Sequence, residues 1–205
     1  MPPAAGADYS AKKDEELVPL ILLDPELYRH LMARHEERLV RYVSRISGLG
    51  RDDAEDVAQE ALIKAYRNLA DFDTSLKFTS WLYRIAHNET MSHFRRLKAR
   101  PQVVRSDQED DVDLAAWVAV DPDYPGHLDR HLAAQEIRDA LGRLDEKYRE
   151  VLVLRYLEER DYQEISDILR KPMGTVATLL NRAKASLRQV LAAGESNKKR
   201  DQQTI

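Results

Sequence analysis

The sequence predicts an all-α protein built from two small helical domains that are joined by a flexible acidic linker. Apolar residues recur at helical spacing in several segments, and no segment shows the sustained alternation of a strand. A proline-rich stretch without helical periodicity separates the first three of these segments from the others. With 205 residues, the chain is long enough for two such domains.

The charge distribution supports the same division, although the net charge is only −4. Residues 76–105 carry a local charge of +6, residues 107–129 carry −8, and residues 168–193 carry +5. Two basic patches on either side of an acidic stretch are typical of two modules that face nucleic acid. Solvated helix faces would give the same charges.

The composition excludes several classes of protein. Because the chain has no cysteine, disulfide scaffolds, thiol catalysis and cysteine-built zinc sites are excluded. The longest apolar run, Leu17 to Leu23, is broken by Pro19 and is far shorter than the ~18–20 residues of a membrane span. No basic stretch followed by an apolar one opens the chain, so we expect no secretory signal and a cytoplasmic protein.

Residues 1–24 are predicted to form an N-terminal extension, a tail in which only the apolar run is able to dock. A long helix follows, because Asp24 can cap its free N–H groups. Pro25 fits the first position of this helix, where its missing backbone N–H would have had no partner within the helix. Gly48 and Gly50 end this helix. Its apolar face consists of Leu27, Leu31, Leu39, Tyr42, Val43 and Ile46.

Two more helices complete the first domain, which is predicted to span residues 25–100. Asp52 or Asp53 can cap the second helix. The third helix runs from about Ser80 to Ala99, and Pro101 stops it. The residues predicted to point inward are Ala54, Val57, Ala58, Ala61, Leu62, Ala65 and Leu69, then Trp81, Leu82, Ile85, Ala86, Phe94 and Leu97.

Residues 101–127 are the predicted linker, and a second helical domain over residues 128–192 follows it. One helix of that domain reopens at Leu128, and Asp145 can cap the next one. Residues 193–205 are predicted to form a polar tail.

The strongest motif of the chain lies in residues 161–188. A short helix, Asp161–Arg170, is followed by a tight break and by a second helix that starts at Gly174 or Thr175. The apolar face of the second helix holds Val176, Leu180, Ala183 and Leu187. Its polar face holds Thr175, Thr178, Asn181, Arg182 and Ala185, with Arg188 at the flank. This pattern is typical of a helix-turn-helix whose second helix enters the major groove of DNA, and an ordinary helical hairpin is the alternative.

A second motif combines aromatic and basic residues in the third helix. Phe72, Phe78, Trp81, Tyr83 and Phe94 interleave with cations that end in the run from Arg95 to Arg100. Single-stranded DNA is bound by this mixture, in which cations meet phosphates and flat rings meet unstacked bases. The alternative is that the rings belong to the core and the cations to a solvated helix end.

Two weaker features each admit two interpretations. The acidic, polar run from Asp52 to Glu60 is either a docking face for a basic partner or a solvated helix face. His127 and His131 have zinc-capable spacing, but without a nearby glutamate base they more simply belong to a solvated helix start. No glycine-rich phosphate loop is present, and no cofactor is predicted.

Four ordered motifs together resemble the bacterial sigma-70 family, in its small extracytoplasmic-function (ECF) group. They are Asp53-Ala-Glu-Asp-Val-Ala-Gln-Glu-Ala-Leu, Phe78-Thr-Ser-Trp-Leu-Tyr-Arg-Ile-Ala-His-Asn, Tyr162-Gln-Glu-Ile-Ser, and Gly174-Thr-Val with Asn181-Arg-Ala-Lys. The resemblance implies a sigma-2-like helical bundle and a sigma-4-like helix-turn-helix domain. It implies a non-enzymatic factor that gives core RNA polymerase its promoter recognition, strand opening and transcription initiation.

The resemblance also implies a partner for each surface. Residues expected to bind the β′ clamp helices of core polymerase are Asp53, Asp56, Gln59 and Glu60. Residues expected at the minus-10 element are Lys77, Trp81, Arg84, Asn88, Arg95, Arg96, Lys98 and Arg100. Residues expected at the minus-35 element are Thr175, Thr178, Asn181, Arg182, Lys184 and Arg188. The second domain would also touch the β flap, and an anti-sigma factor is a further expected partner.

The sequence departs from the family pattern at a few positions. Ala177 and Leu179 stand where the family usually has Lys and Arg, and Ser92 stands where it often has Asp. Two expected phosphate contacts are therefore missing. Two other functions stay open at this point: a stand-alone helix-turn-helix regulator, and a sigma-like mimic that titrates an anti-sigma factor.

Overall fold

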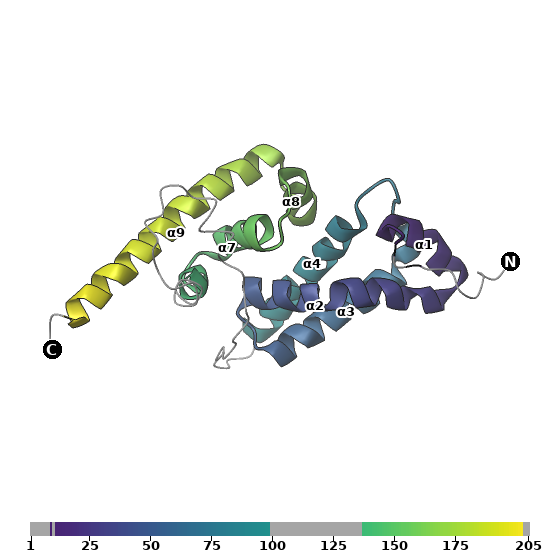
Figure 1. Cartoon of the computed structure of the whole chain (residues 1–205), viewed down its shortest axis with the longest axis horizontal. Coiled ribbons are helices and arrows are strands. Elements are labelled where there is room, and N and C mark those ends of the chain that lie inside the picture. The colour runs from purple at the N-terminus through teal and green to yellow at the C-terminus, as the bar shows by residue number, and fades with distance from the viewer. Residues whose placement is uncertain (1–8, 10, 99–136, 203–205) are drawn as a thin grey trace. The chain divides into compact units, whose positions relative to one another are not determined.

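The computed structural model describes residue 9 and residues 11–98 and 137–202, and every regular element among them is helical (Figure 1). The all-α prediction is confirmed. The chain divides into two compact units, one holding most of the described residues before the predicted linker and the other most of those after it. The predicted linker and the histidine pair lie outside the described residues, as do the first residues of the predicted second domain.

The first unit is a bundle of three long helices with a short fourth helix against it. α2 (Tyr28–Ser47), α3 (Arg51–Arg67) and α4 (Phe78–Lys98) pack on one another in pairs. Every residue predicted for the apolar faces of α2 and α3 is buried, whereas Trp81, Ile85 and Phe94 of α4 are only half-buried. Tyr42 and Tyr83 meet in the middle of this core, with their ring centroids 4.9 Å apart.

The helix starts follow local chemistry. Asp24 caps as predicted, since its carboxylate accepts from the Glu26 N–H at 3.2 Å, and a 3₁₀ turn, η1 (Pro25–Leu27), leads into α2. The left-handed φ of 72° at Gly48 ends α2. The cap predicted for α3 is wrong: its N-cap is Gly50, and Asp52 and Asp53 lie in its first turn, where they face the positive end of the helix dipole.

Residues 14–23 are not a tail. They form α1 (Asp14–Leu23), and the side chains of Leu17, Val18 and Ile21 are at most 2% exposed. The predicted extension is therefore corrected over this range, because burying three apolar side chains outweighs the cost of Pro19 inside the helix. The apolar run that was expected to dock does so, against the 3₁₀ turns η1 and η2 (Leu69–Asp71) and against α4.

After residue 145 the chain forms α7 (Glu146–Leu152), a π-helical turn η3 (Val153–Leu157), α8 (Tyr162–Leu169) and α9 (Met173–Gln202). Residues 137–142 are also helical, and the Arg149 guanidinium donates to the carbonyls of Leu141, Gly142 and Leu144 at their end. The backbone of α9 stays helical to Gln202, so residues 193–202 of the predicted polar tail continue this helix.

Candidate nucleic-acid and polymerase interfaces

The four acidic and polar residues predicted on α3 lie on its surface. Asp53, Asp56, Gln59 and Glu60 are all exposed, while the buried stripe of the same helix faces α2 and α4. Glu60 has a partner within the unit, because its carboxylate lies 3.3 Å from the Arg96 guanidinium of α4. The four residues predicted for docking are therefore all exposed, and one of their carboxylates is paired with a residue predicted to bind DNA.

Beside Gln59 lies an apolar groove that the sequence analysis missed. Exposed Met32 of α2 and exposed Ile63 and Tyr66 of α3 line it, and its volume is about 530 Å³. Tyr28 also lines it and donates its buried hydroxyl to the Leu62 carbonyl at 2.7 Å. The signal was available, since Ile63 and Tyr66 are large apolar residues placed off the buried stripe of a helix.

Three of the predicted minus-10 residues share one face of α4. Arg84, Asn88 and Arg95 lie within about 40° of one another at the ~100° per residue of an α-helix. Asn88 and Arg95 are exposed and Arg84 is half-buried. The Arg95 guanidinium folds back onto its own helix, donating to the Met91 carbonyl at 3.3 Å and to the Ser92 hydroxyl at 3.0 Å.

Arg96 does not belong to that face. It is turned about 120° from Arg84 around the helix axis, toward α3 and Glu60. Lys77 is exposed immediately before α4. The backbone of Lys98 is the end of α4, and Arg100 lies outside the described residues. The structure thus gathers part of the predicted minus-10 set and separates Arg96 from it.

Trp81 belongs to an aromatic cluster at the start of α4. Its ring centroid lies 5.1 Å from that of Phe72 and 5.6 Å from that of Phe78. Phe72 and Phe78 are buried, whereas Trp81 is half-buried. Most rings of the aromatic motif therefore belong to the core, and the half-buried Trp81 stays a predicted base contact.

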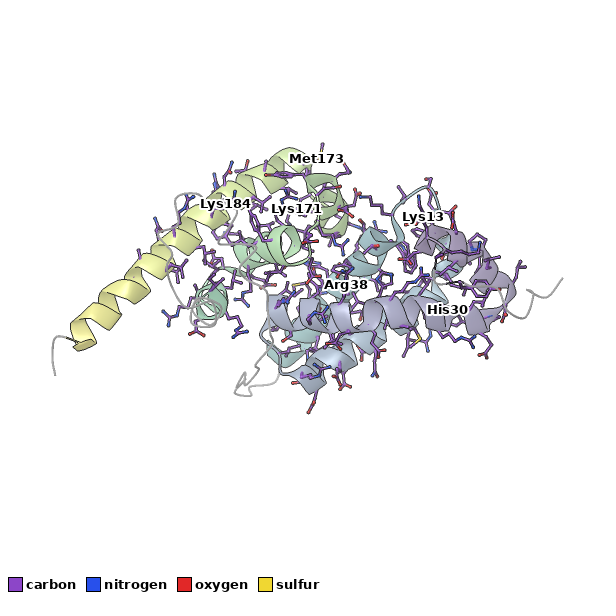
Figure 2. The ribbon with its side chains drawn as sticks, viewed as in Figure 1. Lys13, His30, Arg38, Lys171, Met173 and Lys184 are labelled. Carbon is purple, nitrogen blue, oxygen red and sulfur yellow. The ribbon has the colours of Figure 1, made fainter. Side chains whose placement is uncertain are left out.

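The helix-turn-helix is formed as the sequence predicts. Asp161 and Glu164 make a reciprocal capping box at the start of α8, with bonds of 2.9 and 2.8 Å. The turn contains Arg170 in the left-handed region, with φ 51°, and the Ser166 hydroxyl donates to the Lys171 carbonyl at 2.6 Å. α9 starts one residue earlier than expected, at Met173, which is exposed and labelled with Lys171 in Figure 2.

The two faces of α9 also agree with the prediction. Val176, Leu180, Ala183 and Leu187 are buried, and the exposed residues are Thr175, Thr178, Asn181, Arg182, Ala185 and Arg188. Lys184 differs from the other candidates, since it is half-buried and its ammonium lies 5.5 Å from the centre of the Tyr156 ring. Thr178 uses its hydroxyl within the helix, donating to the Gly174 carbonyl at 2.9 Å.

Neither a metal centre nor a membrane helix is found in the described part of the chain. Across residues 11–98 and 137–202, no three potential metal ligands gather, and no helix has the length and hydropathy to cross a bilayer. What the geometry offers is surface: one acidic helix face beside an apolar groove, and two helices that present exposed cations.

Comparison with known proteins identifies the family. Residues 31–100 match the family profile of sigma-70 region 2, and residues 134–187 match that of sigma-70 region 4. The ECF RNA polymerase sigma factor SigW of Bacillus subtilis is 32% identical over 172 residues, which cover 82% of this chain and 90% of SigW. The chain belongs to the ECF group of the sigma-70 family.

Other relatives agree. The ECF sigma-E factor of Escherichia coli K12 is 31% identical over 169 residues, covering 80% of this chain and 86% of that protein. Among solved structures, CnrH in complex with the cytosolic domain of CnrY aligns over 88% of this chain and 97% of that one, with 25% identity and a TM-score of 0.65. RpoE of Bartonella quintana, solved with the anti-sigma factor NepR, shares the fold, with a TM-score of 0.61 and 22% identity over 80% of this chain and 96% of that one.

This ECF sigma factor therefore directs RNA polymerase to promoters and takes part in transcription initiation. The region 2 match covers most of α2 and all of α3 and α4, and the region 4 match covers α7, α8 and the first half of α9, which include the helix-turn-helix.

Proposed function

We propose that α3 is the surface that docks on core RNA polymerase. Its exposed residues Asp53, Asp56, Gln59 and Glu60 match the basic coiled coil of the β′ clamp helices in charge, and the adjoining groove supplies apolar area. Charge provides orientation and association rate, whereas the groove of Met32, Ile63 and Tyr66 provides buried area.

α4 and residues on either side of it are proposed to bind and open the minus-10 element. The residues assigned are Lys77, Trp81, Arg84, Asn88, Arg95, Arg96, Lys98 and Arg100. The shared face of Arg84, Asn88 and Arg95 supports this assignment, because it can follow one strand, and the open side of Trp81 can stack on an unpaired base.

α9 is proposed to read the minus-35 element as duplex DNA. The residues assigned are Thr175, Thr178, Asn181, Arg182, Lys184 and Arg188. Its exposed polar face lies opposite the buried stripe, as in recognition helices that enter the major groove. The same unit would contact the β flap.

The domain bounds carry over with one change. We assign residues 14–100 to the polymerase and minus-10 domain and residues 128–192 to the minus-35 domain, with 101–127 as the connection between them. The factor supplies binding alone, in the cytoplasm, and the polymerase performs the phosphoryl transfer. An anti-sigma factor is a proposed partner, supported by the capture of the similar protein CnrH with the cytosolic domain of CnrY.

The observation that carries this proposal is the joint presence of both regions on one chain. A stand-alone helix-turn-helix regulator needs no counterpart of α2 to α4, and the region 2 match over residues 31–100 argues against it. Reconstituted transcription with core polymerase on a genomic promoter library tests the proposal. We expect a discrete set of new start sites, whereas a mimic that titrates an anti-sigma factor would yield none.

A further inference from the structure

The first turn of α1 contains three consecutive acids that are bonded to three different parts of the first unit. Asp14 pairs with Arg34 of α2 at 2.7 Å and with His35 at 2.6 Å. Glu15 accepts the backbone N–H of Phe78, the first residue of α4, at 2.7 Å. Glu16 stays within α1 and accepts the Lys13 N–H at 3.1 Å. Of these three carboxylates, Glu15 is the one bonded to the helix that we propose for the minus-10 element.

The position of Glu15 is fixed by its neighbours rather than by α1 alone. A helix of 10 residues with an internal proline is not stable by itself. α1 is held in place by its buried residues Leu17, Val18 and Ile21. Arg34 holds it as well, because its guanidinium also donates hydrogen bonds to the carbonyls of Tyr9 and Lys12. In Figure 2, Lys13 marks the end of α1 at which these bonds gather. Glu15 is therefore connected to α2 through the bonds of its neighbour Asp14 to Arg34 and His35.

The bond that Glu15 accepts is placed where α4 begins. The first N–H groups of a helix have no partner within the helix, and an anion there also meets the positive end of the dipole. Phe78 is fully buried, so its N–H depends on a protein acceptor. Lys77 lies just before this bond, and Trp81, whose N–H donates to the Lys77 carbonyl, lies one turn after it.

We propose that Glu15 is a positioning residue for promoter opening: its carboxylate fixes the start of α4 so that Lys77 and Trp81 meet the minus-10 strand in a set geometry. This inference rests on the proposed function of α4. It assigns a role to α1, a segment outside the residues 31–100 that match the family profile.

The test compares Glu15→Ala with Glu16→Ala, a control that removes the neighbouring carboxylate from the same turn. Each full-length variant is assayed for competition for core polymerase, for minus-35 duplex binding, and for permanganate reactivity of the minus-10 region in open complexes. The promoter is one selected by the wild-type factor from the genomic library. A third variant, Glu15→Gln, keeps an acceptor oxygen without the charge.

We expect Glu15→Ala to reduce open complexes about tenfold, the size of one lost charge-assisted hydrogen bond, with core and duplex binding within about twofold of wild type. Glu15→Gln should recover part of the loss, and Glu16→Ala should behave as wild type. Opening by Glu15→Ala at the wild-type level overturns the inference. So does a loss that appears equally in core binding, because that is the signature of general destabilisation.

The proposed function and the role of Glu15 can be contradicted by different results. If the wild-type factor opens no promoter with core polymerase, the proposed function fails and takes the role of Glu15 with it. If the wild type opens its promoter and Glu15→Ala opens it equally well, only the role of Glu15 is wrong.

Discussion

Single side chains decide how the docking face can be tested. Asp56 is exposed on α3, whereas Glu60 is held by Arg96 across the helix pair. Reversing Glu60 would set two cations against each other and disturb α4 as well as the polymerase surface. Asp56 is therefore the cleaner position at which to change the charge.

Asp56→Arg should weaken binding to core polymerase about tenfold, which is ~1.4 kcal/mol. Because Asp56 lies off the buried stripe of α3, the free energy of unfolding should change by no more than ~0.5 kcal/mol. Competition binding against a reference sigma factor measures the first quantity, and thermal unfolding measures the second. Asp71→Arg makes the same charge change at an exposed position outside α3 and should leave competition unchanged. Equal competition by both variants would contradict docking through α3.

Asp14 predicts a pH dependence of stability. Burial raises the pKa of Asp14. The hydrogen bonds from His35 and Arg34 and the charges of these two residues together lower it by more than burial raises it, so the pKa in the folded chain is below its ordinary value. A carboxyl whose pKa falls on folding stabilises the fold above the unfolded pKa, and that contribution is lost as pH falls through the folded pKa.

Asp14→Asn should therefore be less stable than wild type near neutral pH, with the difference shrinking below about pH 4. Denaturant unfolding at a series of pH values gives the difference curve. Repeating the comparison in an Arg34→Gln background should flatten the curve, since a partner that lowers the pKa is then missing. If the difference in unfolding free energy between wild type and Asp14→Asn were the same at pH 3 and pH 7, folding would not change the pKa of Asp14, and the prediction would be wrong.

The helices show which parts of the architecture are encoded locally. The stripes of α2, α3 and α9 were predictable because each apolar set has helical period and a cap or glycine at an end. α1 was missed because Pro19 and a short length argue against a helix, and only contact with the rest of the unit stabilises it. Helical periodicity places Arg96 about 120° from Arg84, but its pairing with Glu60 depends on how α3 and α4 pack, which the sequence pattern does not specify.

Two cations of α9 that the sequence predicts equally for the minus-35 element differ in their exposure. Arg182 is exposed on the polar face, whereas Lys184 is half-buried over the Tyr156 ring. Arg182→Ala should weaken binding to minus-35 duplex DNA by ~1–3 kcal/mol if the guanidinium contacts a base pair. Lys184→Ala should weaken this binding less. It should also change the slope of log K against log[salt] by less than the value of about one that a full phosphate contact contributes.

Fluorescence anisotropy over a salt series measures both effects. Lys147→Ala removes an exposed cation of α7 that pairs with Asp145, and it is the control for a change in net charge. If Lys184→Ala costs more affinity than Arg182→Ala, the proposed orientation of α9 on DNA is wrong.

The chain as a whole should unfold in two steps, one for each compact unit. One fully buried leucine in each unit can report on its unfolding. Leu82 in the first unit is 0% exposed, and Leu180 in the second unit is 1% exposed. Leu→Ala in such positions costs ~2–5 kcal/mol and should lower the midpoint of one transition by roughly 8 °C or more. Scanning calorimetry of Leu82→Ala and Leu180→Ala should move different transitions, whereas a joint shift in both variants would mean that the units unfold as one.

The bond between Glu60 and Arg96 has a thermodynamic consequence for the order of assembly. In the free factor, Arg96 competes with a basic surface for Glu60, and Glu60 competes with phosphate for Arg96. A basic surface that binds Glu60 therefore leaves Arg96 available to phosphate. Phosphate bound to Arg96 likewise leaves Glu60 available to the basic surface. Linkage makes these two effects equal in size. Since the pair is exposed and worth at most ~1 kcal/mol, the reciprocal gain is about fivefold at most. Docking through α3 and DNA capture through α4 would then be weakly cooperative by a single ion pair, without any movement of a helix.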